Sequence, residues 1–289
     1  MHIYNYNPMQ TILYATDYSQ NSVAALHYAH TLCFRLKAKL LVLHVFDEPM
    51  SLATKVSLSY LKKEKELYEA HKMKLEAFCY EHLKGSPIVT NREVLAIENR
   101  SSIDGILEAI VTHGPDMVVV GTKGGSALKE FLLGSTAKGL IKKAPCSVLT
   151  IPEHTAPTNI HTLVYATDFE EADIFAIRQL VKIAEPFKAA VKIVHITTQA
   201  EYEENRQVEW IKKMLEQKVD YKPMGFERIF SEDILKELHA YVQRSEISIL
   251  GMLERDDGSL MRKVMHKDLV IAMESYLAIP LLCFKVGGL

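Results

Sequence analysis

The heptapeptide Ile12-Leu13-Tyr14-Ala15-Thr16-Asp17-Tyr18 returns later in the chain as Leu163-Val164-Tyr165-Ala166-Thr167-Asp168-Phe169. The two copies are offset by 151 residues, from Asp17 to Asp168. The pentapeptide at residues 41–45 matches residues 192–196 at the same offset. Two separated segments that share one offset indicate a duplicated domain.

Two further matches extend the duplication to the end of the chain. Residues 116–121 resemble residues 246–251 at an offset of 130, and residues 144–149 resemble residues 279–284. The fall in offset predicts that the second copy has lost about 21 residues, and with them a helix, between its second and fourth strands. We expect domains at 1–153 and 158–289, joined by a linker at Pro152–Pro157.

Each copy alternates short apolar runs with segments of helical periodicity. In the first copy we expect strands at 12–15, 40–46, 88–95, 117–120 and 146–151, with helices around 25–36, 61–75, 103–110 and 128–143. Ser19 or Asn21 could cap the first helix. Near-continuous apolar strands that alternate with helices predict a parallel sheet covered on both faces. The predicted fold is therefore α/β, with two tandem doubly wound, Rossmann-like domains of mainly five parallel strands each.

Composition argues against several classes of protein. The 289 residues carry 34 basic and 36 acidic side chains, and this balance gives no electrostatic case for a nucleic-acid or membrane partner. No apolar run reaches the length of a spanning helix, and the start does not resemble a signal peptide. The four cysteines form no CxxC pair, which indicates a reduced, cytoplasmic compartment.

Two segments at predicted strand ends carry unusual chemistry. One is Ala15-Thr16-Asp17; the other is Gly121-Thr122-Lys123-Gly124-Gly125-Ser126, followed further on by Gly134-Ser135-Thr136. Glycines in such loops let backbone N–H groups approach phosphate oxygens, and a helix N-terminus adds its positive end. Gly121 alone could equally mark a simple turn. Gly134 within a helical pattern is costly unless a new helix starts near it.

Other groups of residues that could form metal or catalytic sites are better explained by structural roles. His27 and His30 lack further ligands at metal-binding spacing, and His44 and His195 recur at equivalent places as satisfied core histidines. The chain has no Walker A lysine motif and no nucleophile elbow. We therefore assign no catalytic residues and no metal site.

The glycine spacing resembles the nucleotide-binding pattern of the universal stress protein family. Gly121, Gly124, Gly134 and Ser135 match its fixed positions, and the 15–19 run resembles the family's first strand end. The resemblance implies strand order 3-2-1-4-5 and a site for ATP with Mg²⁺. The residues implied at that site are Ala15, Thr16, Asp17, Val45, Gly121, Thr122, Lys123, Gly124, Gly134, Ser135 and Thr136.

This resemblance also implies a function: a cytoplasmic sensor or interaction module of the stress response, which binds ATP in its first half. A slow ATPase and an interaction scaffold with an empty site remain alternatives. The last strands, 146–151 and 281–286, are the expected contact edges, either in an intramolecular pseudo-dimer or between chains in a homodimer. In the second copy Gly251 is expected to keep the first glycine, but Glu254 and Val264 replace the others, which predicts loss of ATP binding there.

Overall fold

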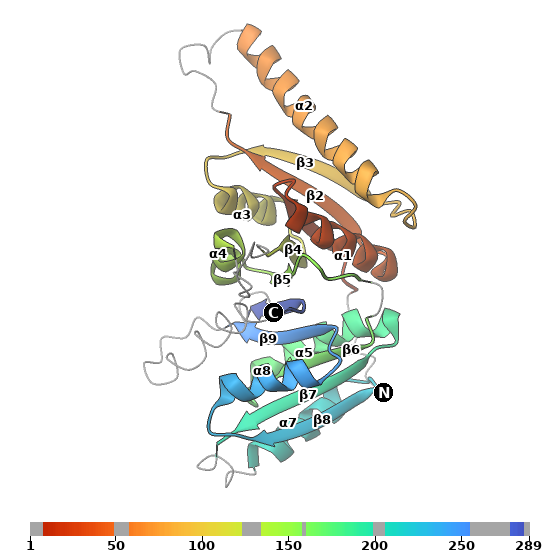
Figure 1. Ribbon diagram of the computed structural model, residues 1–289, viewed down its shortest axis with the longest axis vertical. Helices are drawn as coiled ribbons and strands as arrows, with labels where there is room; N and C mark the ends of the chain where they lie inside the picture. The colour runs from red at the N-terminus through yellow and green to blue at the C-terminus, as the bar shows by residue number, and fades with distance from the viewer. Residues whose placement is uncertain are drawn as a thin grey trace.

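The strands of both halves form one ten-stranded sheet in the order β3-β2-β1-β4-β5-β10-β9-β6-β7-β8. The computed structural model describes residues 8–48, 58–122, 134–157, 160–198, 206–254 and 278–285. The first half has the predicted order 3-2-1-4-5, and the second half repeats it in the opposite direction across the sheet. The chain therefore consists of two doubly wound α/β halves, and the second half keeps all five strands (Figure 1).

The elements of the first half follow one another along the chain as predicted in type, and the second half repeats the alternation of strands and helices. The first half contains β1 (Thr11–Thr16), α1 (Gln20–Leu36), β2 (Lys39–Phe46), α2 (Leu58–Leu83), β3 (Arg92–Glu98), α3 (Ser102–His113), β4 (Met117–Gly121), α4 (Ser135–Lys143) and β5 (Ser147–Ile151). The second half contains β6 (Thr162–Ala166), α5 (Glu171–Ala184), η2 (Glu185–Phe187), β7 (Ala190–Thr197), α7 (Arg206–Lys218), β8 (Met224–Phe230), α8 (Ile234–Arg244), β9 (Ile249–Glu254) and β10 (Leu281–Lys285).

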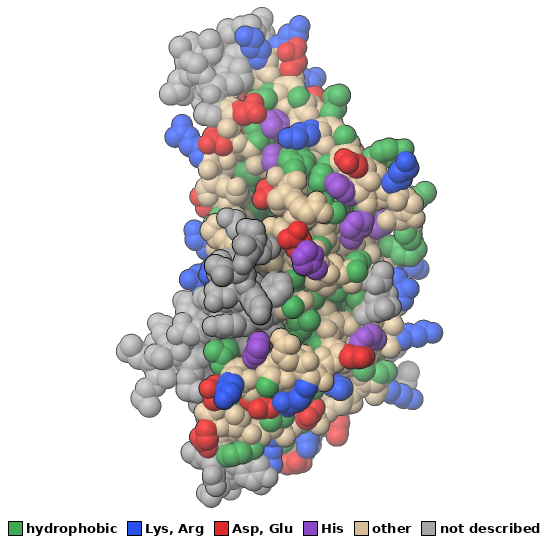
Figure 2. All heavy atoms as spheres, viewed as in Figure 1, with side chains coloured by type: hydrophobic (Ala, Val, Ile, Leu, Met, Phe, Trp, Pro, Cys, Tyr) green, Lys and Arg blue, Asp and Glu red, His purple; other side chains and the backbone are tan. Residues whose placement is uncertain are grey.

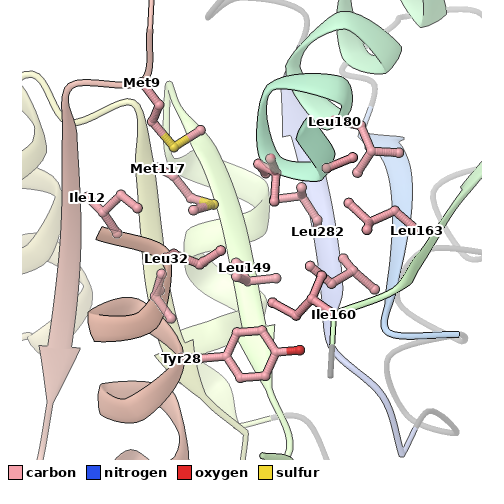
Figure 3. Close-up of a cluster of buried hydrophobic side chains, with 14 of the residues drawn as sticks. Met9, Ile12, Tyr28, Leu32, Met117, Leu149, Ile160, Leu163, Leu180 and Leu282 are labelled. Atoms are coloured by element: carbon pink, nitrogen blue, oxygen red, sulfur yellow. The ribbon is translucent and has the colours of Figure 1, made fainter. Parts of the chain in front are cut away.

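Helices cover both faces of this sheet, because its central strands bury side chains on both sides. Ile12 and Tyr14 of β1 join a core with α1, α2, α5 and α7, whereas Leu13 and Ala15 join a second core with α3, α4 and α8. Each core continues from one half into the other. Figure 3 shows side chains of both halves meeting in the first of these cores, with Leu149 of β5 close to Leu282 of β10.

The two halves are joined through their last strands. β5 pairs with β10 in antiparallel fashion, and Leu149 lies opposite Leu282. The other edge of β5 pairs with β4, and the other edge of β10 pairs with β9. Both edges of each last strand are therefore paired within the chain.

Two element boundaries differ from the sequence expectation. The third strand begins at Arg92 rather than at Ile88, which is 81% exposed and lies in the preceding turn. Its pairing with β2 starts at Leu40 opposite Arg92. The fourth helix begins at Ser135, and the remainder of its expected range before residue 134 lies outside the described residues.

Strand pairing also corrects the alignment of the two halves. Val119 and Gly251 pair with Tyr14 and Tyr165 respectively, and these tyrosines are equivalent at the offset of 151. The true offset of β4 and β9 is thus 132, and the expectation that Gly251 keeps the glycine of Gly121 is wrong. A side chain at Gly251 would approach the rings of Tyr165 (3.2 Å) and Phe284 (3.3 Å), so this glycine makes room for two aromatic residues inside the sheet.

The same register changes two other expectations about the second half. Leu149 and Leu282 are equivalent, so Cys283 corresponds to Thr150 and not to Val148, as the match of residues 144–149 with 279–284 implied. The expected loss of a helix is also wrong, because α7 connects β7 with β8. It is 13 residues long where α2 has 26, so the shortening falls within this helix.

The surface matches the near-neutral charge of the sequence. Figure 2 shows basic and acidic side chains interspersed over the viewed face. Within the described part of the chain, no helix combines the length and apolarity that a membrane crossing requires.

Candidate functional site

A cavity lies where the strand order of the first half reverses, at the carboxyl ends of β1 and β4. β1 pairs with β2 on one side and with β4 on the other, and the crossing helices leave a crevice at such a switch point. The cavity has a volume of about 150 Å³. Its walls are formed by residues 15–17, 19, 21, 22, 45, 102, 106, 120–122 and 134–137.

The end of β1 forms one wall through a continuous chain of hydrogen bonds. The Thr16 hydroxyl donates to Oγ of Ser22 (2.9 Å), and the Ser22 hydroxyl donates to the carbonyl oxygen of Ser19 (2.7 Å). The backbone N–H of Tyr18 donates to Thr16 Oγ1 (3.0 Å). These bonds hold the turn after β1 against the start of α1.

Asp17 stands exposed at the rim of this cavity. Its Oδ1 accepts the backbone N–H of Ser19 at 3.0 Å, as in an Asx turn, which fixes the direction of the side chain. The turn uses only Oδ1 and does not need the second carboxylate oxygen, Oδ2. Asp17 can therefore accept a hydrogen bond from a ligand hydroxyl or amino group at the cavity mouth.

His44 supports the same turn from β2. Its Nδ1 lies 2.9 Å from the carbonyl oxygen of Thr16, and its ring packs against Tyr18, with ring centres 4.3 Å apart. Burial lowers the pKa of His44, and the nearby His71 and Lys74 lower it further. The equivalent His195 bonds the carbonyl of Thr167 at 2.7 Å. Both histidines are satisfied by the backbone, which confirms the structural role predicted for them.

Gly121 ends β4 at a point of close backbone approach. A Cβ atom at this position would lie 2.5 Å from the carbonyl oxygen of Asn21 in the first turn of α1. The glycine is thus required by packing, whether or not a ligand is bound. The next residue, Thr122, is buried, and its backbone N–H donates to Ile151 at 2.9 Å.

Gly134 is the N-cap of α4, so it avoids the cost of a glycine inside the helix expected at 128–143. Its backbone is extended (φ −65°, ψ 153°), and Ser135 and Thr136 form the first turn of the helix. The first backbone N–H groups of a helix have no partner within the helix, and a glycine cap offers no side chain to satisfy them. This end of α4 therefore presents N–H donors, two hydroxyl groups and the positive end of the helix dipole at the cavity.

All nine predicted site residues that the structure describes line this one cavity. They are Ala15, Thr16, Asp17, Val45, Gly121, Thr122, Gly134, Ser135 and Thr136. The two others, Lys123 and Gly124, lie outside the described residues. The described residues hold no group of three or more His, Cys, Asp or Glu side chains that could bind a metal ion.

Sequence reasoning missed the contribution of α1 and α3 to the cavity. Asn21, Ser22, Ser102 and Ile106 line it although no motif marks them. α3 packs tightly over Val45, since a Cβ at Gly105 would lie 2.7 Å from Val45 Cγ1. The only available signal was topological: α3 must cross back over β2 and β1 to reach β4, which brings its first turn to this edge.

Comparison with known proteins decides the family. Residues 8–152 match the model of the universal stress protein family. The chain belongs to this family. A curated universal stress protein of Staphylococcus haemolyticus is 28% identical over 170 residues, which cover 56% of this chain and 96% of that protein.

Solved structures extend the likeness in fold to both halves. A universal stress protein from Archaeoglobus fulgidus aligns with 97% of this chain and 100% of its own, at a TM-score of 0.68 and 16% identity. A Pseudomonas aeruginosa protein of the same family aligns with 96% of this chain and 93% of its own, at a TM-score of 0.68 and 14% identity. The tandem arrangement of two doubly wound halves therefore also occurs in solved universal stress proteins.

Proposed function

We propose that this universal stress protein binds ATP in its first half, at the cavity between β1 and β4. One observation carries the proposal: the residues after β1, the end of β4 and the N-terminus of α4 line a single cavity although they are far apart in sequence. Each supplies a different part of nucleotide recognition. Asp17 and Val45 suit the adenosine, and Gly134, Ser135 and Thr136 suit the phosphates.

The chemistry of the α4 N-terminus supports a phosphate rather than a neutral group. Backbone N–H donors and the helix dipole favour negative charge at this end. The hydroxyl groups of Ser135 and Thr136 can donate to further phosphate oxygens. Mg²⁺ bound to the phosphates would neutralise the charge that remains. Lys123 and Gly124 would contribute from the adjoining segment.

The described cavity encloses only part of such a ligand. Its volume of about 150 Å³ is below the roughly 300–1,000 Å³ of pockets that bury most of a drug-sized molecule. We propose that the adenosine lies inside and that the phosphates extend along the start of α4. A partly exposed nucleotide suits a sensor or interaction module, in which a partner distinguishes the loaded from the empty protein.

The wider assignment follows from this site. We propose a cytoplasmic protein of the stress response, with a nucleotide-binding domain at 1–153 and a second domain at 158–289 that together form an intramolecular pseudo-dimer. ATP hydrolysis, if it occurs, is slow, because no general base is positioned beside the proposed phosphates in the described residues.

Nucleotide content and affinity test the proposal. The purified protein is denatured, the released material is identified by mass spectrometry, and ATP, ADP and cAMP are titrated calorimetrically into the empty protein. We expect one ATP per chain and loss of binding in Gly134→Val. The backbone conformation at Gly134 is one that any residue can adopt, and this residue lines the cavity where the phosphates are proposed to bind. Gly225→Val is the matched control, because nothing lies within 4 Å of its added Cβ in the second half.

The alternatives give different results in the same assays. A true ATPase would turn over faster than about one per second and lose that activity in Asp17→Ala. An interaction scaffold with an empty site would release no nucleotide and show no heat on titration. The first result would overturn the sensor role and slow hydrolysis, and the second would overturn ATP binding itself.

A further inference from the structure

The second half differs from the first at one buried position beside its own switch point. At the offset of 151, Asp173 in the first turn of α5 is equivalent to Ser22 in the first turn of α1. Ser22 lines the cavity of the first half. Asp173 is only 1% exposed.

The carboxylate of Asp173 accepts four hydrogen bonds from β6 and from the turn after it. Its Oδ1 accepts the hydroxyl of Tyr165 (2.7 Å), and its Oδ2 accepts the hydroxyl of Thr167 (2.7 Å). Oδ2 also accepts the backbone N–H groups of Asp168 (3.2 Å) and Glu170 (3.0 Å). We call these five residues the Asp173 network.

The first half contains the same donors but uses them differently. The hydroxyl of Tyr14 donates to the backbone carbonyl of Ser22 (2.6 Å), and the N–H of Ser19 donates to Asp17 (3.0 Å). The short Ser22 side chain bonds to Thr16 and to the Ser19 carbonyl. The position of Ser22 at the first cavity thus carries no acidic side chain, whereas the second half has a buried carboxylate at the equivalent position.

Two further replacements change the same region of the second half. By the strand register, Leu253 is equivalent to Gly121 and Glu254 is equivalent to Thr122. Leu253 belongs to the hydrophobic core, with Ala172 of α5 packed against that core, so an apolar side chain stands where the first half has none. Glu254 is 1% exposed and adds a second buried acidic group at the end of β9.

We propose that the Asp173 network closes the switch point of the second half to nucleotide phosphates, so that the chain binds nucleotide in its first half alone. The reason is electrostatic and steric together: the carboxylate repels phosphate and consumes the donors of the turn, and Leu253 fills the space beside it. The second half then serves as a permanently closed structural partner. This inference rests on the proposed function, because it compares the second half with a first half that binds ATP.

A transplanted carboxylate tests the electrostatic part. Ser22→Asp brings the acidic side chain to a turn where Tyr14, Thr16 and the N–H groups of Asp17 and Ser19 offer the same four donors, so we expect the variant to fold. ATP affinity should fall by on the order of 100-fold. Ser22→Asn is the matched control of the same size without the charge, and it should lose much less. An affinity of Ser22→Asp within a few-fold of the unaltered protein would overturn the proposal, as would two ATP bound per unaltered chain.

A stability measurement tests the network without any nucleotide. Asp173→Ala leaves two buried hydroxyl donors and two partly buried backbone N–H donors without their acceptor, and we expect its melting temperature to fall by several degrees. Asp168→Ala keeps the backbone N–H that enters the network and serves as the control. Equal melting temperatures for these two variants would overturn the Asp173 network even if ATP binding in the first half is confirmed. Absence of ATP binding in the unaltered protein, with Asp173→Ala destabilised, would instead overturn the proposed function.

Discussion

Leu149 and Leu282 lie opposite each other across the antiparallel β5–β10 pair, and they occupy equivalent positions in the two halves. Leu149 pairs with Val119 and Leu282 pairs with Gly251, and these residues pair in turn with the equivalent Tyr14 and Tyr165. A local two-fold axis therefore passes between the two leucines. Arg35 and Pro186, also equivalent at the offset of 151, meet near the same axis through a 2.6 Å hydrogen bond from the guanidinium to the Pro186 carbonyl oxygen.

Truncation of either axial leucine should destabilise the whole chain. Both side chains are fully buried, so Leu149→Ala and Leu282→Ala should each cost about 2–5 kcal/mol of unfolding free energy. Because both belong to one core, the double variant should show a coupling of about 0.5–3 kcal/mol. Guanidinium unfolding of the four proteins measures it. Strict additivity would mean that the two halves are independent at this pair.

Gly121→Ala should be destabilising although it adds only a methyl group. The added Cβ would meet the backbone of Asn21 at 2.5 Å, and backbone cannot rotate away as a side chain can, so we expect a cost of about 1–3 kcal/mol. Gly225→Ala in β8 meets nothing within 4 Å and should change stability by less than about 0.5 kcal/mol. Thermal unfolding of the two variants gives the comparison, and equal melting temperatures would contradict the close approach of α1 to β4.

Stability should fall on mild acidification because of three buried or partly buried histidines. Burial lowers the pKa of His27, His30 and His44 below the ordinary value of 6.5, so the unfolded chain takes up protons at a higher pH than the folded chain does. The unfolding free energy therefore decreases as the pH drops from about 6.5 toward the folded-state values.

Among these histidines, His44 faces His71, Lys74 and Asp17. His44→Gln should reduce the slope of stability against pH between about pH 7 and 5. Its stability at about pH 8 separately gives the cost of the altered contact with the Thr16 carbonyl. A slope equal to that of the unaltered protein would contradict this assignment.

The cysteines should be unreactive in the native protein. Cys33, Cys79 and Cys283 are buried, and burial raises the pKa of Cys79 to about 11 and that of Cys146 to about 12. Since the thiolate is the reactive form, labelling by a thiol reagent near neutral pH should be slow. In guanidinium all four thiols should react at once. Rapid labelling of the native chain would show that these sites open without global unfolding.

Much of the architecture could be predicted from local patterns. The repeat at 12–18 and 163–169, with its constant offset into the next strand, was sufficient to predict two doubly wound halves, because buried parallel strands require uninterrupted apolar runs. Periodicity predicted one helix over 128–143, and only the cost of a glycine inside it indicated that a helix could instead start near Gly134. Nine of the eleven predicted site residues line one cavity, because the carboxyl ends of neighbouring parallel strands meet at one edge of the sheet.

Other features required the folded chain. Gly251 resembles Gly121 by local sequence, but strand pairing places it two residues earlier, opposite Tyr165. Register depends on which residues pair across a sheet, and a gap of uncertain length hides it from sequence comparison. The role of Asp173 is hidden in the same way, since its four donors come from the preceding turn and strand and only the folded geometry directs them to one carboxylate.

The sequence alone determined the family pattern, the duplication and the succession of strands and helices in the first half, because these follow from local periodicity and from spacing along the chain. Tertiary structure decided how the halves join at Leu149 and Leu282, why Gly121 must be glycine, and why the two switch points differ. Those properties depend on contacts between residues distant in the sequence, and packing in three dimensions alone brings them together.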